Sequence, residues 1–309
     1  MRLGVLDVGS NTVHLLVVDA HRGAQPTPQL SRKSMLRLAE HIDKRGDLAL
    51  EGADALVGAA IGARRQAKEL GCDEILAFAT SAVRDAGNSA EVLERVRIES
   101  GVDLTVLTGD DEARLTFLAV RRWLGWNAGN LICLDIGGGS LELAAGPDED
   151  PVVALSVPLG AGRLTRDWFD ADPPPKAQVA ALREHVDAAL APAARDLLST
   201  GTPDRVVASS KTFRTLARLA GAAPSSAGPR VRRVLTRDGL RQVIGFISRM
   251  SSSDLAELDG VSAARAHQTL AGAVVAAGAM EALGVREIEL CPWALREGII
   301  LRRLDQFSA

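Results

Sequence analysis

The sequence of 309 residues contains no tyrosine, and aromatic residues make up only 3% of it. Proteins that bind single-stranded nucleic acid stack its bases on aromatic side chains, and few are available here. The formal net charge of −3 also lacks the positive excess of a nucleic-acid or membrane-surface binder. We therefore expect neither nucleic acid nor membrane as a partner. An anionic ligand would have to be held by individually placed residues in a local basic groove.

Cysteines and long apolar runs are also scarce. The three cysteines, Cys72, Cys133 and Cys291, are odd in number and lack metal-ligand spacing, so buried free thiols in a reducing compartment are expected. The longest apolar stretch, LAGAVVAAGAMEALG from Leu270, is too short to span a bilayer. The first residues, MRLGVLDVGSN, place Asp7 where a signal peptide needs an apolar core. These features predict a cytoplasmic protein.

One pattern occurs twice in the chain: residues 6–15 read LDVGSNTVHL and residues 134–143 read LDIGGGSLEL. Each copy places Asp at the end of an apolar strand, followed by a glycine turn with small polar residues and a second strand. Glycine permits close backbone approach, so the N–H groups of such a turn can point at phosphate oxygens, and Ser and Asn add donors. A single turn of this kind is also typical of an ordinary β-hairpin. Two matched copies favour two phosphate-binding turns.

Strands and helices alternate along the chain, which predicts an α/β fold. The length exceeds the usual size of one hydrophobic core, so we expect two domains with one copy of the repeat in each. A glycine-rich link before the second copy predicts an N-terminal domain of residues 1–124 and a C-terminal domain of residues 125–309. The C-terminal helix, about residues 295–309, is able to pack back on the N-terminal domain.

Prolines and capping residues predict local structure. The segment with Pro26 and Pro28 is expected to be a loop. Asn88 or Ser89 is expected to cap the helix NSAEVLERVRIESG, and Asp110 the helix DDEARLTFLAVRRWLGW. The alternating apolar residues of VDLTVLTG predict a strand.

Five motifs, in this order, resemble those of the exopolyphosphatase and guanosine-pentaphosphate phosphohydrolase family: DVGSNTVHLLV, ATSAVRDAGN, TGDDEARLTF, LDIGGGSLEL and WALREGIILRRL. That family lies within the superfamily of actin, Hsp70 and hexokinase. The resemblance spans nearly the whole chain and implies two ribonuclease-H-like domains with an interdomain cleft. It further implies hydrolysis of phosphoric anhydrides, a requirement for Mg²⁺ or another divalent cation, and a homodimer.

The motif TGDDEARLTF implies a catalytic base. The family has two adjacent acidic residues before Ala-Arg, and the second of these, here Glu112, is the group implied to activate the attacking water. Asp111 stands where the family usually has Glu. A carboxylate in the first turn of a helix also interacts favourably with the helix dipole without any catalytic role. Asp110 and Asp111 already supply that interaction, which favours Glu112 as the base.

Two carboxylates flank the second glycine turn, and the resemblance places both near a divalent metal. These are Asp135 and Glu142. Mg²⁺ usually keeps several waters and takes one or two carboxylates together with substrate oxygens. The alternative roles are turn capping for Asp135 and a solvent-facing strand position for Glu142.

The remaining site residues are expected to bind phosphate. Arg84 follows an apolar strand, where a guanidinium can make forked, charge-assisted hydrogen bonds to phosphate. The alternative is a surface ion pair between Arg84 and Asp85, which contributes little. The full set expected to bind phosphate is Ser10, Asn11, Arg84, Gly138, Gly139, Ser140, Lys211 and Arg214.

Lys211 marks a departure from the family pattern, because relatives usually keep a glycine there that lets adenosine lie against the backbone. A side chain at this position disfavours purine binding and favours an extension of the phosphate track by Lys211 and Arg214. Solvated helix-end positions are the alternative for both. A basic run of Arg230, Arg232 and Arg233 is either a solvated face or part of the substrate path.

Together these features predict an exopolyphosphatase that removes the terminal phosphate of linear inorganic polyphosphate and releases orthophosphate. The first alternative is a guanosine pentaphosphate 5′-phosphohydrolase, with guanosine nucleotides as substrate or regulator. Lys211 and the absence of a long C-terminal extension favour polyphosphate. A non-catalytic polyphosphate or nucleotide sensor is the alternative of another class, and the presence of Glu112, Asp135 and Glu142 argues against it.

Overall fold

The computed structural model describes residues 1–21, 26, 28–43 and 45–306. Two compact units make up the chain: the first comprises Met1–Leu115 and Leu295–Ala309, and the second comprises Thr116–Ala294. Among the described residues, no helix combines the length and the apolar character that crossing a bilayer requires.

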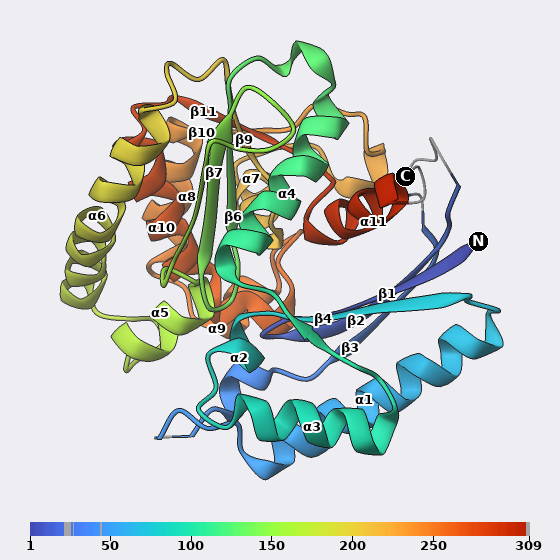
Figure 1. Ribbon diagram of the computed structural model, residues 1–309. Helices are drawn as coiled ribbons and strands as arrows, with labels where there is room; N and C mark the ends of the chain where they lie inside the picture. The colour runs from blue at the N-terminus through green and yellow to red at the C-terminus, as the bar shows by residue number, and fades with distance from the viewer. Residues whose placement is uncertain (22–25, 27, 44, 307–309) are drawn as a thin grey trace. The chain divides into compact units, whose positions relative to one another are not determined.

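The first unit contains a five-stranded sheet in the order β3-β2-β1-β4-β5 (Figure 1). Strands β1, β2 and β3 are antiparallel neighbours, whereas β4 runs parallel to β1 and β5 parallel to β4. Their bounds are β1 Arg2–Val8, β2 Thr12–Asp19, β3 Pro28–Met35, β4 Glu74–Ala79 and β5 Thr105–Val106.

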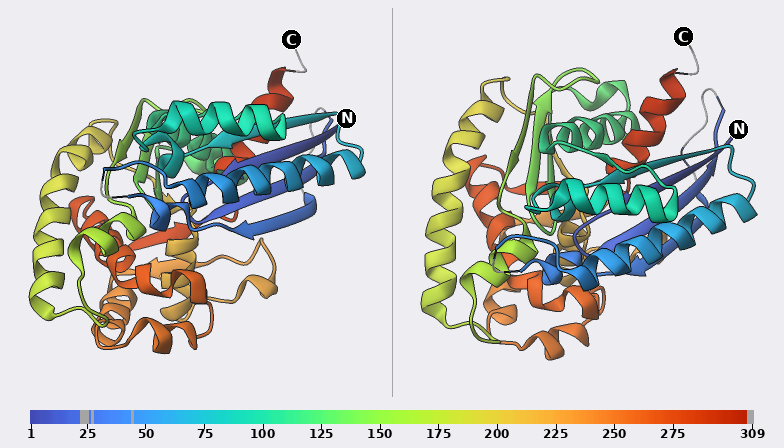
Figure 2. Two further views of the ribbon diagram at one scale, coloured as in Figure 1. Left: turned by 90° about the horizontal axis from the view of Figure 1, so that it is seen from below. Right: turned by 60° about the horizontal axis from the view of Figure 1, so that its bottom comes forward.

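Helices cover both faces of this sheet. The side chains of β1 alternate between the faces: Leu6 and Val8 join the core beneath α1 and α3, while Leu3 and Val5 join the core beneath α11. Helices α1 and α3 lie side by side on their face (Figure 2). The helices of this unit are η1 Leu38–His41, α1 Leu50–Glu69, α2 Ser81–Arg84, α3 Ser89–Ser100 and α11 Leu295–Gln306, and α4, Gly109–Leu124, begins in it.

The second unit contains a six-stranded sheet in the order β10-β11-β9-β6-β7-β8. Strands β6, β7 and β8 are antiparallel neighbours, β9 is parallel to β6, β11 is parallel to β9, and β10 is an antiparallel edge strand. Their bounds are β6 Leu131–Ile136, β7 Leu141–Gly146, β8 Val153–Val157, β9 Arg205–Ala208, β10 Val234–Thr236 and β11 Glu287–Leu290.

The core of the second unit is formed by one face of the sheet and a layer of helices around α10. The apolar stretch LAGAVVAAGAMEALG forms most of α10, which packs against α5, α6, α7 and α8. Gly278 lets α6 approach closely, because a Cβ there would lie 2.7 Å from Val186 Cγ1. The helices are η2 Trp126–Ala128, α5 Ala161–Trp168, α6 Lys176–Leu198, α7 Lys211–Leu219, η3 Ser225–Ala227, α8 Arg237–Ile247, α9 Ser252–Ala256, η4 Ala263–Gln268 and α10 Thr269–Ala282.

The two sheets repeat one topology. In each, three consecutive antiparallel strands are followed by two strands parallel to the first, and the first two strands flank the glycine turn. This order and these directions confirm the predicted α/β fold with two ribonuclease-H-like units. The repeated sequence pattern therefore marks the same structural position in both units.

One expectation about strands is wrong, and a second is confirmed over two residues only. The segment after Pro26 is not a loop, because residues from Pro28 form the eight-residue strand β3. A proline is tolerated there since Pro28 is the first residue of an edge strand, where its missing N–H costs no ladder bond. In VDLTVLTG only Thr105 and Val106 pair with a neighbouring strand.

The helix caps also differ from the expectations. Asn88 precedes α3, but its side chain does not cap that helix. Its amide instead accepts from the Leu48 N–H at 2.8 Å and donates to the Leu48 carbonyl at 3.0 Å. At the start of α4 the cap is Thr108 and not Asp110: the Thr108 hydroxyl accepts from the Asp111 N–H at 3.1 Å and donates to the Asp111 carboxylate at 2.7 Å.

Candidate active site

The first glycine turn joins β1 to β2 and is closed by the Gly9 N–H, which donates to the Thr12 carbonyl at 2.9 Å. Ser10 and Asn11, both predicted to bind phosphate, are buried. The Ser10 hydroxyl lies 2.9 Å from the hydroxyl of Ser81, the first residue of α2. Ser81 was not among the predicted site residues, although it lies in the ATSAVRDAGN motif that carries the family resemblance.

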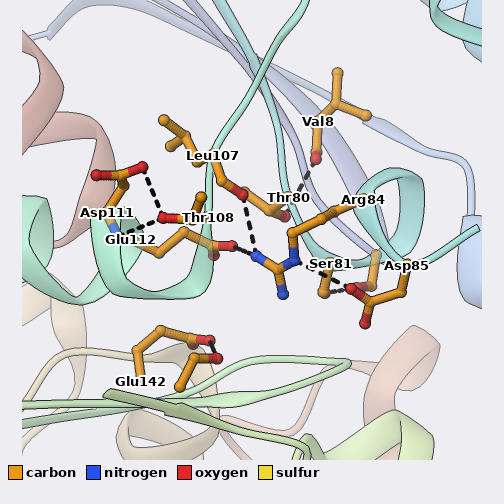
Figure 3. A network of polar contacts seen from close by, with 12 residues as sticks. Val8, Thr80, Ser81, Arg84, Asp85, Leu107, Thr108, Asp111, Glu112 and Glu142 are labelled. Atoms are coloured by element: carbon orange, nitrogen blue, oxygen red, sulfur yellow. Dashed lines mark hydrogen bonds and ion pairs between the residues drawn. The ribbon is translucent and has the colours of Figure 1, made fainter. Parts of the chain in front are cut away.

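Arg84, the last residue of α2, is held by three acceptors (Figure 3). Its Nε donates to Asp85 at 3.0 Å, and its Nη1 donates to the Leu107 carbonyl at 3.2 Å and to the Glu112 carboxylate. Burial by itself lowers the pKa of Arg84, but the charges of Glu112 and Asp85 outweigh it, and the net shift is upward. The guanidinium therefore keeps its charge next to the predicted base.

The second terminal nitrogen of Arg84 is directed away from these partners (Figure 3). Within the part of the chain that the structure describes, Nη2 makes no hydrogen bond. The pair with Asp85, weighed above as an alternative to phosphate binding, uses Nε and leaves Nη2 unaffected. Arg84 can therefore pair with Asp85 and bind phosphate at the same time, because Nη2 has two N–H donors to offer an anion.

The three adjacent acids in the first turn of α4 differ in how far they are exposed to solvent. Asp110 and Asp111 are exposed, and Asp111 completes the cap with Thr108. Glu112 is buried at 8% exposure and its carboxylate lies against Arg84. All three acids lie in the first turn of the helix, where a carboxylate interacts favourably with the helix dipole, and Glu112 is the buried one of the three.

The second glycine turn joins β6 to β7 and is closed by the Gly137 N–H, which donates to the Ser140 carbonyl at 2.9 Å. The N–H groups of Gly138, Gly139 and Ser140 have no hydrogen-bond partner among the described residues. Three consecutive backbone donors without a partner are what an anion-binding turn offers.

Asp135 and Glu142 lie directly opposite each other on β6 and β7, so their side chains lie on the same face of the sheet. Ser209 donates to Asp135 Oδ2 at 2.6 Å, and Ser156 donates to Glu142 Oε1 at 3.0 Å. Glu142, labelled in Figure 3, is buried at 6% exposure, which contradicts a solvent-facing position. Its Oε2 lies 3.8 Å from the point where a Cβ on Gly137 would be, which places the carboxylate beside the turn.

The donor set fits a divalent cation that is only partly held by protein. Within the described residues no three His, Cys, Asp or Glu side chains gather into a complete metal cage. Mg²⁺ does not require one, because it keeps waters and uses one or two carboxylates with substrate oxygens. Asp135 and Glu142 next to a turn with unpartnered N–H groups match that requirement.

Lys211 and Arg214 lie at the start of α7, three residues apart and on neighbouring positions of the helix surface. The Ser210 hydroxyl caps this helix by accepting from the Phe213 N–H at 3.3 Å. Lys211 lines a small pocket with hydroxyl side chains and Arg265, whereas Arg214 does not line it. Lys211 thus lies with other polar groups around this pocket.

The basic run before β10 is occupied by contacts within the second unit. Arg230 stacks over the ring of Trp123 at 4.4 Å, and Arg232 pairs with Glu287 at 2.9 Å. Arg233 donates to four backbone carbonyls of its own loop. These contacts favour a structural role over a place in the substrate path.

Comparisons with known proteins agree with one another. A model of the Ppx/GppA phosphatase family matches residues 16–307. Exopolyphosphatase 1 of Mycobacterium tuberculosis is 62% identical over 305 residues, which are 99% of this chain and 89% of that protein. Guanosine-5′-triphosphate,3′-diphosphate pyrophosphatase of Aeromonas hydrophila is 27% identical over 96% of this chain and 58% of that protein. The crystal structure of an exopolyphosphatase from Cytophaga hutchinsonii, 23% identical, has the same fold, with a TM-score of 0.89 over 99% of this chain and 98% of that one.

Proposed function

Because the chain belongs to the Ppx/GppA phosphatase family, we propose that it is an exopolyphosphatase, which hydrolyses the terminal phosphate of linear inorganic polyphosphate and releases orthophosphate. The observation that carries this proposal is the pair of Arg84 and Glu112. It combines a buried carboxylate suited to activate water with a guanidinium that retains donors for phosphate. The name of the 62% identical relative supports the same substrate.

In the first unit, Arg84 Nη2 and the side chains of Ser10 and Asn11 bind phosphate oxygens. Glu112 accepts a proton from water as the water oxygen attacks the terminal phosphorus, and the bond from phosphorus to the bridging oxygen breaks. The shortened polyphosphate leaves with that bridging oxygen. The Arg84 charge stabilises the negative charge of the transition state.

In the second unit, the N–H groups of Gly138, Gly139 and Ser140 bind phosphate oxygens, and Asp135 and Glu142 would hold Mg²⁺. The metal, when bound, supplies neutralisation of phosphate charge. Ser209 and Ser156 fix the orientation of the two carboxylates through their hydrogen bonds. Lys211 adds a positive charge at the start of α7. The interdomain cleft, the homodimer and the cytoplasmic location stay predictions.

The test is a measurement of orthophosphate release with Mg²⁺ present and after its removal by a chelator. Linear polyphosphates of defined short and long length are compared with guanosine pentaphosphate and ATP at equal phosphate concentration. Release from polyphosphate that stops on chelation and returns with Mg²⁺ is the expected result. Release from none of the substrates would reject the proposal in favour of a sensor.

A second candidate substrate is guanosine pentaphosphate, because the Aeromonas hydrophila relative is named for a guanosine nucleotide. Polyphosphate remains favoured, since the relative named for it is far more similar to this chain. The family resemblance also implies a glycine for purine binding at the position of Lys211. Release of phosphate mainly from guanosine pentaphosphate would make that nucleotide, and not polyphosphate, the favoured substrate.

A further inference from the structure

The three glycine carbonyls of the second turn accept hydrogen bonds from the start of α5. The Ala161 N–H donates to the Gly137 carbonyl at 3.0 Å, and the Arg163 N–H donates to the Gly138 carbonyl at 2.9 Å. The Gly139 carbonyl accepts from Nε of the Arg163 side chain at 2.8 Å. The segment that follows β8 thus supplies three donors to three successive carbonyls.

These three bonds determine the direction of the N–H groups. A peptide unit is planar and trans, so its C=O and the N–H of the next residue point in opposite directions. Fixing the carbonyls of Gly137, Gly138 and Gly139 towards α5 therefore directs the N–H groups of Gly138, Gly139 and Ser140 away from it. Glycine peptides have the greatest backbone freedom, so without these donors the turn would adopt several orientations.

Gly160 allows α5 to begin this close to the turn. A Cβ on Gly160 would lie 2.2 Å from the Gly139 carbonyl carbon and 2.4 Å from the Ser140 nitrogen. Its φ of −71° is accessible to any residue, so space and not backbone conformation requires glycine here.

The first unit has a related arrangement at its own glycine turn. The Ala39 N–H donates to the Ser10 carbonyl, and the N–H groups of Leu36 and Arg37 donate to the Asn11 carbonyl, each at 3.1 Å. This segment follows β3, as α5 follows β8. All three of these donors are backbone groups, whereas the second turn depends on the side chain of Arg163 for one of its carbonyls.

We propose that Arg163 is a positioning residue for phosphate binding. By donating to the Gly139 carbonyl it holds the following peptide so that the Ser140 N–H is directed to the ligand. This inference rests on the proposed function of the turn, and it extends that function to a residue outside the predicted site. The backbone bond from Arg163 survives a substitution, so a variant isolates the side-chain contribution.

The experiment compares R163M, which removes the donor, with R163K, whose ammonium can donate to the same carbonyl. R166M is the matched control, because Arg166 lies on the same helix, is half-exposed and pairs with Asp167. Steady-state kinetics with polyphosphate are combined with amide ¹H–¹⁵N spectra of Gly139 and Ser140, recorded with and without tripolyphosphate. Thermal unfolding is measured for each protein.

We expect R163M to raise KM by about tenfold, equivalent to ~1.4 kcal/mol, with a smaller change in kcat. The Ser140 amide should broaden before any ligand is added, because the peptide exchanges between orientations. R163K should recover a sharp amide and most of the affinity, and R166M should match the wild type. If R163M does not fold, R163K becomes the test of the proposal. A wild-type KM and a sharp Ser140 amide in R163K would then support the positioning role.

Three results would overturn the inference. The first is an R163M protein with wild-type KM and a sharp Ser140 amide. The second is a raised KM with unchanged amides in both R163M and R163K, which would make Arg163 a direct ligand of phosphate. The third is a folded R163K with a broadened amide when R163M is unfolded. If the wild-type protein released no phosphate, the exopolyphosphatase proposal would be rejected. The amide spectra with tripolyphosphate would still test whether Arg163 positions the turn.

Discussion

Glu112→Gln is the substitution that most directly tests the catalytic base. The glutamine side chain has nearly the same shape, and its amide oxygen can accept the hydrogen bond from Arg84 Nη1 that the carboxylate accepts now. What it loses is the capacity to take a proton from water. A positioned general base typically accelerates a reaction by about 10²–10⁴-fold, so kcat on polyphosphate should fall by that factor.

Glu112→Gln should lower the free energy of unfolding only modestly, although Glu112 belongs to a buried ion pair. Removing one partner of a buried pair costs about 3–5 kcal/mol when the other charge is left without compensation. Arg84 keeps Asp85 and the Leu107 carbonyl as acceptors, and its side chain is 21% exposed. We therefore expect a loss of about 1–2 kcal/mol, closer to that of one charge-assisted hydrogen bond. The melting temperature should fall by only a few degrees.

The assay pairs orthophosphate release with calorimetric titration of polyphosphate into the inactive variant. Asp110→Asn is the matched control, because Asp110 is an exposed acid in the same turn of α4. It should retain wild-type activity and stability. Glu112→Gln should still bind polyphosphate, since Arg84 remains charged. A folded Glu112→Gln protein with more than a tenth of the wild-type kcat would refute the assignment of the base.

Four further outcomes are expected. Asp135→Asn should raise the Mg²⁺ concentration for half-maximal activity by at least about tenfold, measured by metal titration, because one of two carboxylate ligands is lost. Arg84→Lys should raise KM for polyphosphate by about tenfold in the same assay, since an ammonium cannot reproduce the forked donors. Burial raises the pKa of the Cys133 thiol well above its usual value; Cys133 should therefore resist a disulfide reagent at pH 8 until the protein unfolds, as mass spectrometry of labelled peptides would show. Gly298→Ala should destabilise the protein by at least ~1–3 kcal/mol in urea unfolding, because a Cβ there would lie 1.9 Å from the Leu115 carbonyl oxygen.

The sequence could predict the architecture because each copy of the turn pattern indicates a local strand-turn-strand structure. An Asp at a strand end followed by glycines predicts a β-turn-β unit, and two matched copies in a chain of this length predict one sheet in each of two domains. Long helices such as α6 and α10 are also visible as apolar patterns. The strand β3 was missed because it lies at a sheet edge, where its PQLSRKSM sequence is mostly exposed and shows no apolar alternation.

Other features depend on contacts between distant segments, which no local pattern reveals. The burial of Glu142 follows from neighbours that cover both faces of β7, so alternation along the strand does not expose it. The pairing of Arg84 with Glu112 brings together residues that are 28 positions apart. The bond from Arg163 to Gly139 likewise joins two segments that are separated by β7 and β8.

The repeat also diverges in the charges around its two turns. In the second unit, Asp135 faces Glu142 across the strand pair, so two carboxylates lie beside the turn. In the first unit the equivalent positions are Asp7 and His14, and His14 is buried with its Nε2 2.7 Å from the Ser31 hydroxyl. Arg296 of α11 lies 3.9 Å from Asp7 and supplies the positive charge there. The first turn thus has a positive charge of the protein itself beside its strand-end Asp, whereas two carboxylates flank the second turn.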